Sequence, residues 1–271
     1  MKLTVVRPAL LDAISTLDLT HYSEAQAPLG FSSLLCQLFG YPAEVYDAPT
    51  LCAAYEGLPA RAMCLYADPV YLLVDRAHVY GLGRAYADLS LNEAQEFADY
   101  LNSQLQGVEV TVSPSGQWYV RSDRVLNVRC YEVEEIMAHS LIDRMPRGED
   151  AGFLVGVYNQ IQMLLHDCHL NKLRVLQGKS SIDALWFYGG GMSLKKIKPS
   201  RWKAVITTQV FAQALARLND IPCIKISEIK SVGKYLCVDE ECAEIDNCVK
   251  MADVLYVGHG KVFKRRRWWK G

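Results

Sequence analysis

The stretch Gln162–Gly191 reads QMLLHDCHLNKLRVLQGKSSIDALWFYGGG and decides the fold class. Its first part has apolar residues at helical spacing and stops at Gly178, and its second part is a short apolar run that leads directly into three glycines. A helix, a buried strand and a glycine turn in this order are typical of an α/β protein. Glycine adopts positive φ and permits close approach, and open α/β sheets bind ligands at the carboxyl ends of their strands. The three glycines therefore mark the candidate site.

Polar side chains gather around this glycine turn. A cleft built from them has two cations, Arg174 and Lys179, to attract a small anionic ligand, and glycine N–H groups to donate hydrogen bonds. The candidate ligand-binding residues are Gln162, His166, Asn171, Arg174, Lys179, Asp183, Trp186, Gly189, Gly190 and Gly191. Each also has a structural alternative: His166 as a partly buried histidine, Arg174 in an ion pair, Trp186 in the core. His166 and His169 have no acidic third ligand at a matching spacing, so we predict no metal site and assign no catalytic residue.

Outside this stretch, Pro146-Arg147-Gly148 is the clearest linker. It predicts an α+β region with antiparallel strands at 1–148 and an α/β region at 149–271. In the first region we expect helices at 9–17, 31–39 and 43–55, a helix between Ser90 and Gly107, and strand pairs at 71–74 with 78–82 and 108–112 with 118–120. Ser90 and Glu93 form the capping-box pattern of a helix start. In the second region we expect helices at 151–176 and 209–218, strands at 182–188, 204–207 and 221–226, and a terminal hairpin at 254–257 and 262–269.

The composition fits a globular protein and argues against a nucleic-acid partner. The chain has 271 residues, of which 51% are hydrophobic and 22% charged, and its formal net charge is -1. A net charge near zero provides no general field for nucleic acid. Basic residues do gather near the end of the chain: Lys261, Lys264, Arg265, Arg266, Arg267 and Lys270. This basic tail is either an anion or nucleic-acid patch or an edge strand whose charges prevent further pairing, and we favour the edge strand.

The sequence also predicts a cytoplasmic protein with no membrane partner. Arg7 interrupts the first apolar run too early for a signal peptide, and no apolar run approaches the ~20 residues of a membrane span. The nine cysteines are scattered and form no C-x-x-C pair, which favours reduced thiols that behave as small hydrophobic residues. A zinc cluster of Cys237, Cys242 and Cys248 is the weaker alternative, because its spacing matches no common zinc pattern.

The segment NQIQMLLHDCHLNKLRVLQGKSSIDALWFYGGG resembles a stretch of a bacterial family described both as RpfE-type regulatory protein and as phosphoglycerate mutase-like. The shared pattern is Gln-Met-Leu-Leu-His, then Asn-x-x-Arg, then Gly, then Leu-Trp before Gly-Gly-Gly. Upstream, Ala67-Asp68-Pro69-Val70 matches a second family motif. The chain departs from the family at Asp183, where Asn is usual, at Tyr188, where Trp is usual, and at Tyr71, where His is usual. The resemblance covers about residues 60 to 210.

The Trp-x-x-Gly-x-Gly element also resembles cofactor-independent phosphoglycerate mutase of the archaeal type, in the alkaline phosphatase superfamily. This resemblance implies an alkaline phosphatase or phosphoglycerate mutase-like α/β fold for the C-terminal part. It further implies two divalent metals held by Asp and His and a Ser or Thr nucleophile. However, the first strand is followed by Arg7-Pro8 in place of the family's Asp-Gly, and His259 lies six residues after Asp253 rather than in an Asp-His metal pair.

These departures favour a mutase-like protein with no metal and no cofactor. We expect it to act as a regulatory or binding protein, with a small anionic ligand or a protein as its partner. Two alternatives stay open. One is an active, metal-dependent phosphoglycerate mutase or phosphatase, and the other is nucleic-acid binding through the basic tail.

Overall fold

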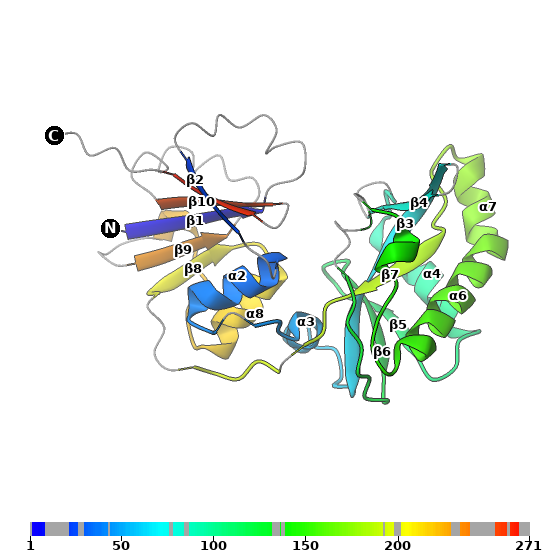
Figure 1. Ribbon diagram of the computed structural model, residues 1–271, viewed down its shortest axis with the longest axis horizontal. Coiled ribbons are helices and arrows are strands. Elements are labelled where there is room, and N and C mark those ends of the chain that lie inside the picture. The colour runs from blue at the N-terminus through cyan, green and yellow to red at the C-terminus, as the bar shows by residue number, and fades with distance from the viewer. Residues whose placement is uncertain are drawn as a thin grey trace. The chain divides into compact units, whose positions relative to one another are not determined.

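The computed structural model divides the chain into two units, with the second inserted into the first (Figure 1). Unit 1 comprises 1–46 and 192–271, and unit 2 comprises 47–191. The structure describes residues 2–8, 22–26, 30–42, 44–75, 78–83, 87–131, 136, 139–191, 193–197, 202–228, 234–238, 253–258 and 261–265. The side chains of 2–8, 22–26, 30–31, 226, 253–258 and 261–265 are not described.

Unit 1 contains a mixed six-stranded sheet in the order β2-β11-β10-β1-β9-β8. Its strands are β1 (Lys2–Pro8), β2 (Tyr22–Gln26), β8 (Ala204–Thr207), β9 (Lys234–Val238), β10 (Asp253–Gly258) and β11 (Lys261–Arg265). The strands β10, β1, β9 and β8 are parallel, whereas β11 runs antiparallel to both of its neighbours. Helix α8 (Val210–Leu218) packs on β8 and against α2 (Gly30–Phe39). The parallel strands with covering helices confirm the predicted α/β class.

Unit 2 is built on an antiparallel sheet whose central strand is the long β3 (Met63–Asp75). Its other strands are β4 (His78–Leu82), β5 (Glu109–Val112), β6 (Trp118–Ser122) and β7 (Ala184–Tyr188). Tyr66 of β3 pairs with Tyr119 of β6 and also with Tyr188 of β7, so these two strands flank β3 on its opposite edges. The predicted hairpin at 71–82 and the predicted strand pair at 108–120 are confirmed.

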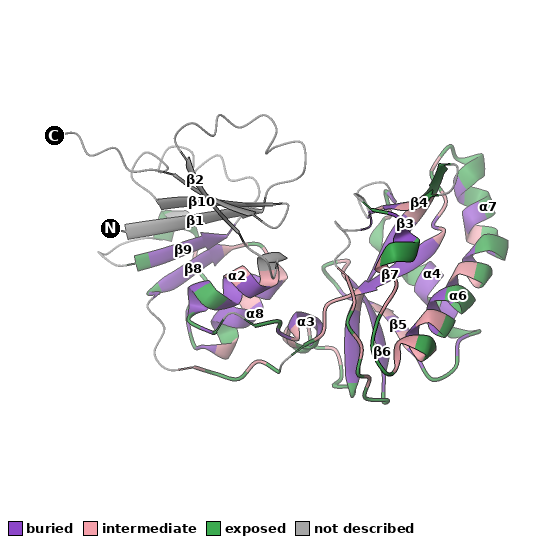
Figure 2. Ribbon diagram, in the orientation of Figure 1, coloured by how far each residue is buried: buried purple, intermediate pink, exposed green. Residues whose placement is uncertain are grey.

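Three of the four described α-helices of unit 2 contact this sheet, and the fourth contacts one of the other three. The four helices are α3 (Ala48–Tyr55), α4 (Leu91–Asn102), α6 (Ala151–Asp167) and α7 (His169–Leu176). Helix α3 contacts β3, α4 contacts β5, α6 contacts β7, and α7 contacts α6. Phe97 and Leu101 of α4 and Ile161 and Leu165 of α6 are fully buried in one core cluster with Trp186. Figure 2 shows that α4 and α6 each carry both buried and exposed residues.

The predicted single helix at 151–176 is two helices, which is a correction. The chain is extended at Cys168 (φ -65°, ψ 129°), between α6 and α7. Neither proline nor glycine stands there. Instead, the amide Nδ2 of Asn171 donates to the carbonyl of Leu165 at 2.8 Å, and that carbonyl belongs to the last turn of α6. The side chain thus satisfies a carbonyl at the interruption, as a buried polar group requires.

Three further expectations differ from the structure. The unit boundaries lie at 46/47 and 191/192 rather than at 148/149, because α6 packs on β7 and β7 pairs with β3. The expected strand at 221–226 forms only a bridge between Val205 and Cys223, followed by a 3-10 helix, Ile226–Glu228. Within the basic tail, β11 is not an edge strand, because β2 pairs with it on the side away from β10.

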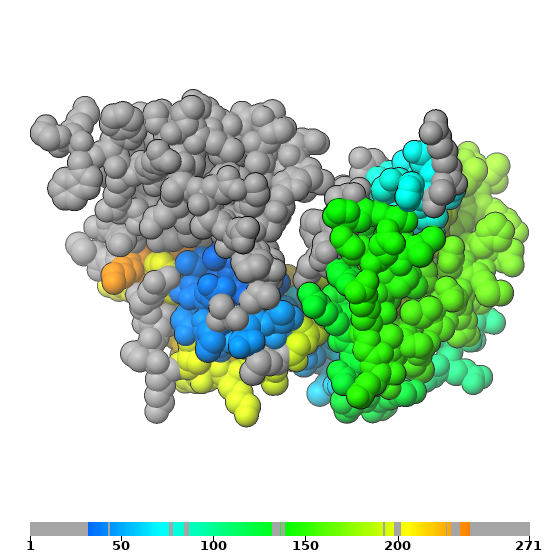
Figure 3. Space-filling view, in the orientation of Figure 1, coloured from blue at the N-terminus to red at the C-terminus, as the bar shows by residue number. Residues whose placement is uncertain are grey.

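Figure 3 shows one face of unit 2 covered mainly by the segment between β6 and α6 and by α6 itself. Within the part of the chain that the structure describes, no helix has the length and apolar character needed to cross a membrane. The predicted helix at 9–17, the cysteines Cys242 and Cys248 and the end of the basic tail after Arg265 lie outside the described residues.

Candidate functional site

The pairing of β3 with β7 joins the two motifs that the sequence singled out. Asp68 stands opposite Trp186, although 118 positions separate them along the chain. The Asp68 carboxylate is only 6% exposed, and it accepts hydrogen bonds from the Tyr188 hydroxyl at 3.0 Å and from Gln117 Nε2 at 3.1 Å. A carboxylate buried with several donors is a stable structural element. The Tyr at position 188 thus serves as one of these donors.

Asn171 connects the helix pair to the strand that follows it. Its amide Nδ2 donates to the Leu165 and Ile182 carbonyls, both at 2.8 Å, and its Oδ1 accepts from the Ile182 N–H at 2.9 Å. The side chain is buried, and these bonds occupy both ends of its amide. Asn171 is therefore a structural bridge between α6, α7 and the start of β7.

Arg174 is buried in the same unit and is only 1% exposed. Its Nε donates to the Ser180 carbonyl at 2.8 Å, one terminal nitrogen donates to the Glu93 carboxylate at 2.6 Å, and the other donates to the Ala87 carbonyl. Glu93 is the first-turn acid of α4, where the helix N-terminus also favours a negative charge. Its side chain pairs with Arg174 instead of closing the capping box.

The guanidinium of Arg174 is enclosed by protein acceptors, and its anion-binding role stays a prediction. Lys179 is partly exposed, with its Nζ 3.5 Å from a Glu93 oxygen. The two cations therefore share one carboxylate of this chain, which offsets part of their positive charge.

Asp183 and Trp186 also make structural contacts. The Leu72 N–H donates to Asp183 Oδ2 at 2.8 Å, and the Ser181 hydroxyl donates to Oδ1 at 2.7 Å. Trp186 Nε1 donates to the Tyr131 carbonyl at 2.8 Å, and its ring makes an edge contact with Tyr158. Asp183 therefore supports the β3–β7 pairing, while Trp186 belongs to the core, as its structural alternative stated.

The three glycines have positive φ values of 84°, 86° and 131°. A Cβ on Gly189 would lie 2.6 Å from Pro49 Cγ, and a Cβ on Gly190 would lie 3.1 Å from Leu65 Cδ2. The first distance is a clash and the second is a tight contact, so any side chain at Gly189 would displace α3 from β7. The glycine turn thus permits close packing inside unit 2. Gly191, which ends the unit, is exposed.

The remaining predicted residues lie on α6. Gln162 is half-buried and His166 is exposed. Neither makes a side-chain hydrogen bond with the described residues. The structure thus brings Asn171, Arg174, Lys179 and Asp183 into a packed network around β7, and it does not join all ten residues in one open cleft.

The buried thiols of unit 2 behave as small hydrophobic groups. Burial raises the pKa of Cys52 to about 12, although the Tyr66 hydroxyl donates to its sulfur at 3.0 Å. Burial also raises the pKa of Cys64 to about 12. Both thiols are therefore protonated at neutral pH and are poor nucleophiles. Among the described residues, no group of three or more His, Cys, Asp or Glu side chains has the arrangement of a metal site.

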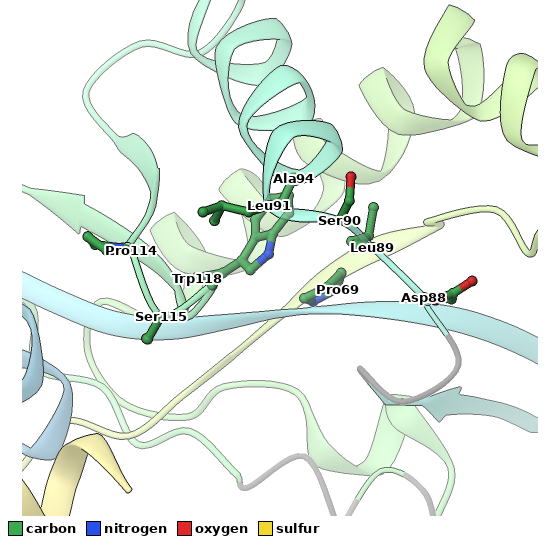
Figure 4. Close-up of a pocket in the computed structure, with 10 residues that line it drawn as sticks. Pro69, Asp88, Leu89, Ser90, Leu91, Ala94, Pro114, Ser115 and Trp118 are labelled. Atoms are coloured by element: carbon green, nitrogen blue, oxygen red, sulfur yellow. The ribbon is translucent and has the colours of Figure 1, made fainter. Parts of the chain in front are cut away.

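A hollow of about 540 Å³ opens elsewhere in unit 2, between the start of α4 and the turn that connects β5 to β6 (Figure 4). Its lining includes Pro69, Ser90, Leu91, Ala94, Ser115 and Trp118. None of the ten predicted residues lines it. The sequence indicated only a helix N-cap role for Ser90 and gave no sign of a hollow beside it. Pro69 belongs to the Ala67-Asp68-Pro69-Val70 motif. This motif was the one sequence signal that could have indicated the hollow.

In unit 1, the parallel strands end together at one edge of the sheet. Val6 of β1 pairs with Val238 of β9, Val238 pairs with Thr207 of β8, and Pro8 pairs with Val257 of β10. Ligands of open α/β sheets bind at such an edge. Arg7-Pro8 therefore lies at the carboxyl edge of the parallel strands, at the end of a strand with neighbours on both sides.

Comparison with known proteins gives a distant relationship. No protein-family model matches the chain. The chain is 25% identical over 103 residues to the 2,3-bisphosphoglycerate-independent phosphoglycerate mutase of Methanothrix thermoacetophila, which is 38% of this chain and 26% of that protein. It is 24% identical over 176 residues to the mutase of the same name from Methanosarcina acetivorans, which is 62% of this chain and 43% of that protein. The matched region thus spans less than half of either relative.

Two solved structures are similar over nearly the whole chain. The PH0037 protein from Pyrococcus horikoshii has a TM-score of 0.50 and 11% identity, with 98% of this chain and 87% of that chain covered. The cofactor-independent phosphoglycerate mutase from Thermoplasma acidophilum DSM 1728 has a TM-score of 0.42 and 14% identity, with 97% and 89% covered. The chain is therefore distantly similar in sequence to 2,3-bisphosphoglycerate-independent phosphoglycerate mutases, and its mixed α/β fold is similar to that of the PH0037 protein.

Proposed function

We propose that this mutase-like chain acts by binding a ligand or a partner, in the manner of an RpfE-type regulatory protein, and does not transfer phosphate by a two-metal mechanism. The observation that carries the proposal is the carboxyl end of β1. The resemblance leads us to expect Asp-Gly close to the nucleophile at this strand, and the chain has Arg7-Pro8 instead. Arginine keeps its positive charge at all physiological pH values, and a cation at this edge disfavours two divalent metals.

The position of Asp253 supports the same proposal. Asp253 begins β10 and pairs with Thr4, whereas Val257 of the same strand pairs with Pro8. A strand rises about 3.3 Å per residue, so Asp253 lies roughly 16 Å from the end of β10 at Gly258. Oxygen ligands bind divalent metals at about 2.0–2.6 Å. Asp253 therefore cannot share a metal with groups at the carboxyl edge of the sheet.

Active phosphoglycerate mutase or phosphatase chemistry is the second candidate, and one sequence observation favours it. The chain continues from Val238, the last residue of β9, as Asp239-Glu240-Glu241. Carboxylates that follow a parallel strand are typical ligands for hard divalent cations. The names of the two curated relatives are consistent with this candidate.

Turnover of 3-phosphoglycerate distinguishes the two candidates. The purified full-length protein is assayed with Mn²⁺, Mg²⁺ or Co²⁺ in a system coupled to enolase, beside a cofactor-independent mutase as the positive control. We expect turnover at least ~10⁴-fold below the control, because such enzymes depend on metal ions for both nucleophile activation and charge stabilisation. Metal-dependent turnover that is lost on Asp239→Asn would reject our proposal and support the enzyme.

A further inference from the structure

Trp118 lies at the bottom of the hollow in unit 2 with an unused hydrogen-bond donor. The residue is only 1% exposed and lines the hollow. Its indole N–H donates to none of the described residues. Figure 4 shows the ring beside the first turn of α4, with its nitrogen on the side of Pro69. The nitrogen is not among the fully buried side-chain atoms that lack a partner, so it is accessible to solvent, and an indole N–H normally finds an acceptor. A molecule in the hollow can supply that acceptor.

The two other described tryptophans differ from Trp118 because their indole N–H groups donate to carbonyls of the chain. Trp186 Nε1 donates to the Tyr131 carbonyl at 2.8 Å, and Trp202 Nε1 donates to the Leu38 carbonyl at 2.7 Å. All three side chains are buried. Trp118 thus lines a hollow and is the one described tryptophan whose indole N–H donates to no carbonyl of the described residues.

The start of α4 adds a second donor at the same place. Ser90 caps the helix, since its Oγ accepts from the Glu93 N–H and its carbonyl accepts from the Ala94 N–H. The N–H of Leu91, the first helical residue, donates to none of the described residues. Such N–H groups point out of the helix start. Leu91, like Trp118, lines the hollow.

The walls of the hollow favour a ligand whose main part is flat and apolar. Pro69, Pro114 and the indole of Trp118 offer flat apolar surfaces, and the Leu91 side chain is 48% exposed at the rim. The volume is in the range of small-molecule sites. The exposed carboxylate of Asp88 lines the same hollow, and it disfavours a second negative charge.

We propose that this hollow binds a small molecule with a carbonyl or carboxylate oxygen on a flat apolar body. The oxygen accepts from Trp118 Nε1–H and from the Leu91 N–H, and the apolar body lies against the proline and leucine side chains. A neutral carbonyl suits the site better than a carboxylate, because of Asp88.

The indole resonances in a ¹H–¹⁵N spectrum of the full-length protein test this directly. The protein is labelled on tryptophan, and the Trp118 signal is assigned with Trp118→Phe. Benzamide, benzoate and benzylamine are then titrated as probes: a neutral acceptor, an anionic acceptor and a ring without an acceptor. We expect a saturable downfield shift of the Trp118 indole proton with benzamide in the millimolar range, a smaller effect with benzoate, and none with benzylamine. The signals of Trp186 and Trp202 should not move.

Two variants keep the test independent of the buried tryptophan. Leu91→Ala removes part of the rim and should weaken benzamide binding about fivefold, as expected for loss of partly buried apolar contact. Leu173→Ala, at a residue of similar exposure (50%) on α7, is the matched control and should leave binding unchanged.

Three results would overturn the site: no saturable Trp118 shift with either acceptor, an equal shift with benzylamine, or equal weakening by the two leucine variants. The site does not depend on the absence of catalysis. Turnover of 3-phosphoglycerate together with benzamide binding would reject the proposed function and leave this site in place.

Discussion

Replacing Arg174 with methionine should destabilise unit 2 by about 3–5 kcal/mol. Methionine has a similar length but no donors, so the substitution leaves the Ser180 and Ala87 carbonyls without a partner. It also leaves the Glu93 carboxylate with only the more distant Lys179. Removing one partner of a buried ion pair typically costs this amount, because the other charge stays buried.

Urea unfolding followed by tryptophan fluorescence measures this change. With a slope of about 2 kcal/mol per molar urea, the midpoint should fall by roughly 2 M. Lys172→Ala, at an exposed position on the same helix, is the control and should shift the midpoint by less than about 0.3 M. If Arg174→Met unfolds at the wild-type midpoint, the guanidinium is not structural, and its assignment as an anion-binding group would be restored.

Three further substitutions test the same network, the glycine turn and a buried thiol of unit 1. Asn171→Ala should cost about 2–4 kcal/mol in urea unfolding, because it leaves the N–H and carbonyl of Ile182 without their partner; a loss below 1 kcal/mol would contradict the bridge. Gly189→Ala should cost at least about 2 kcal/mol, from positive φ and the clash with Pro49, whereas an unchanged midpoint would mean that the turn is open. Burial raises the pKa of Cys36 to about 12 from 9.0, so the unfolded thiol ionises first and stability falls as pH rises from 9 towards 12. Between pH 8 and 10, Cys36→Ala should therefore lose about 1.4 kcal/mol less stability than the wild type, and equal losses would show that this thiol does not contribute.

Local patterns in the sequence predicted the elements that depend on local interactions. The helix ending at Gly40, the hairpin around residues 75–78 and the Ser90 cap all form where propensity and turn chemistry favour them. The interruption at Cys168 could not be predicted in this way. It contains no helix-breaking residue, and the Asn171 amide stabilises it through a contact that exists only in the folded chain.

The surroundings of the candidate site residues could not be predicted for a similar reason. The sequence located a true cluster of polar residues around β7, but it could not reveal their partners. The acceptors for the two terminal nitrogens of Arg174 lie on Glu93 and Ala87, and the acceptor for Trp186 lies on Tyr131, all more than 50 positions away. Whether a buried polar residue is structural or free for a ligand depends on such distant groups. The unused donor of Trp118 was equally invisible before the strands were paired.

The absence of a two-metal centre is the central claim, and Mn²⁺ binding tests it most directly. The full-length protein at about 100 μM is titrated with Mn²⁺, with and without 3-phosphoglycerate, and free Mn²⁺ is followed by its electron paramagnetic resonance signal. Our account predicts that the free signal rises in proportion to added Mn²⁺ from the first addition, as in buffer. Retention of two Mn²⁺ ions per chain at micromolar free metal would contradict it.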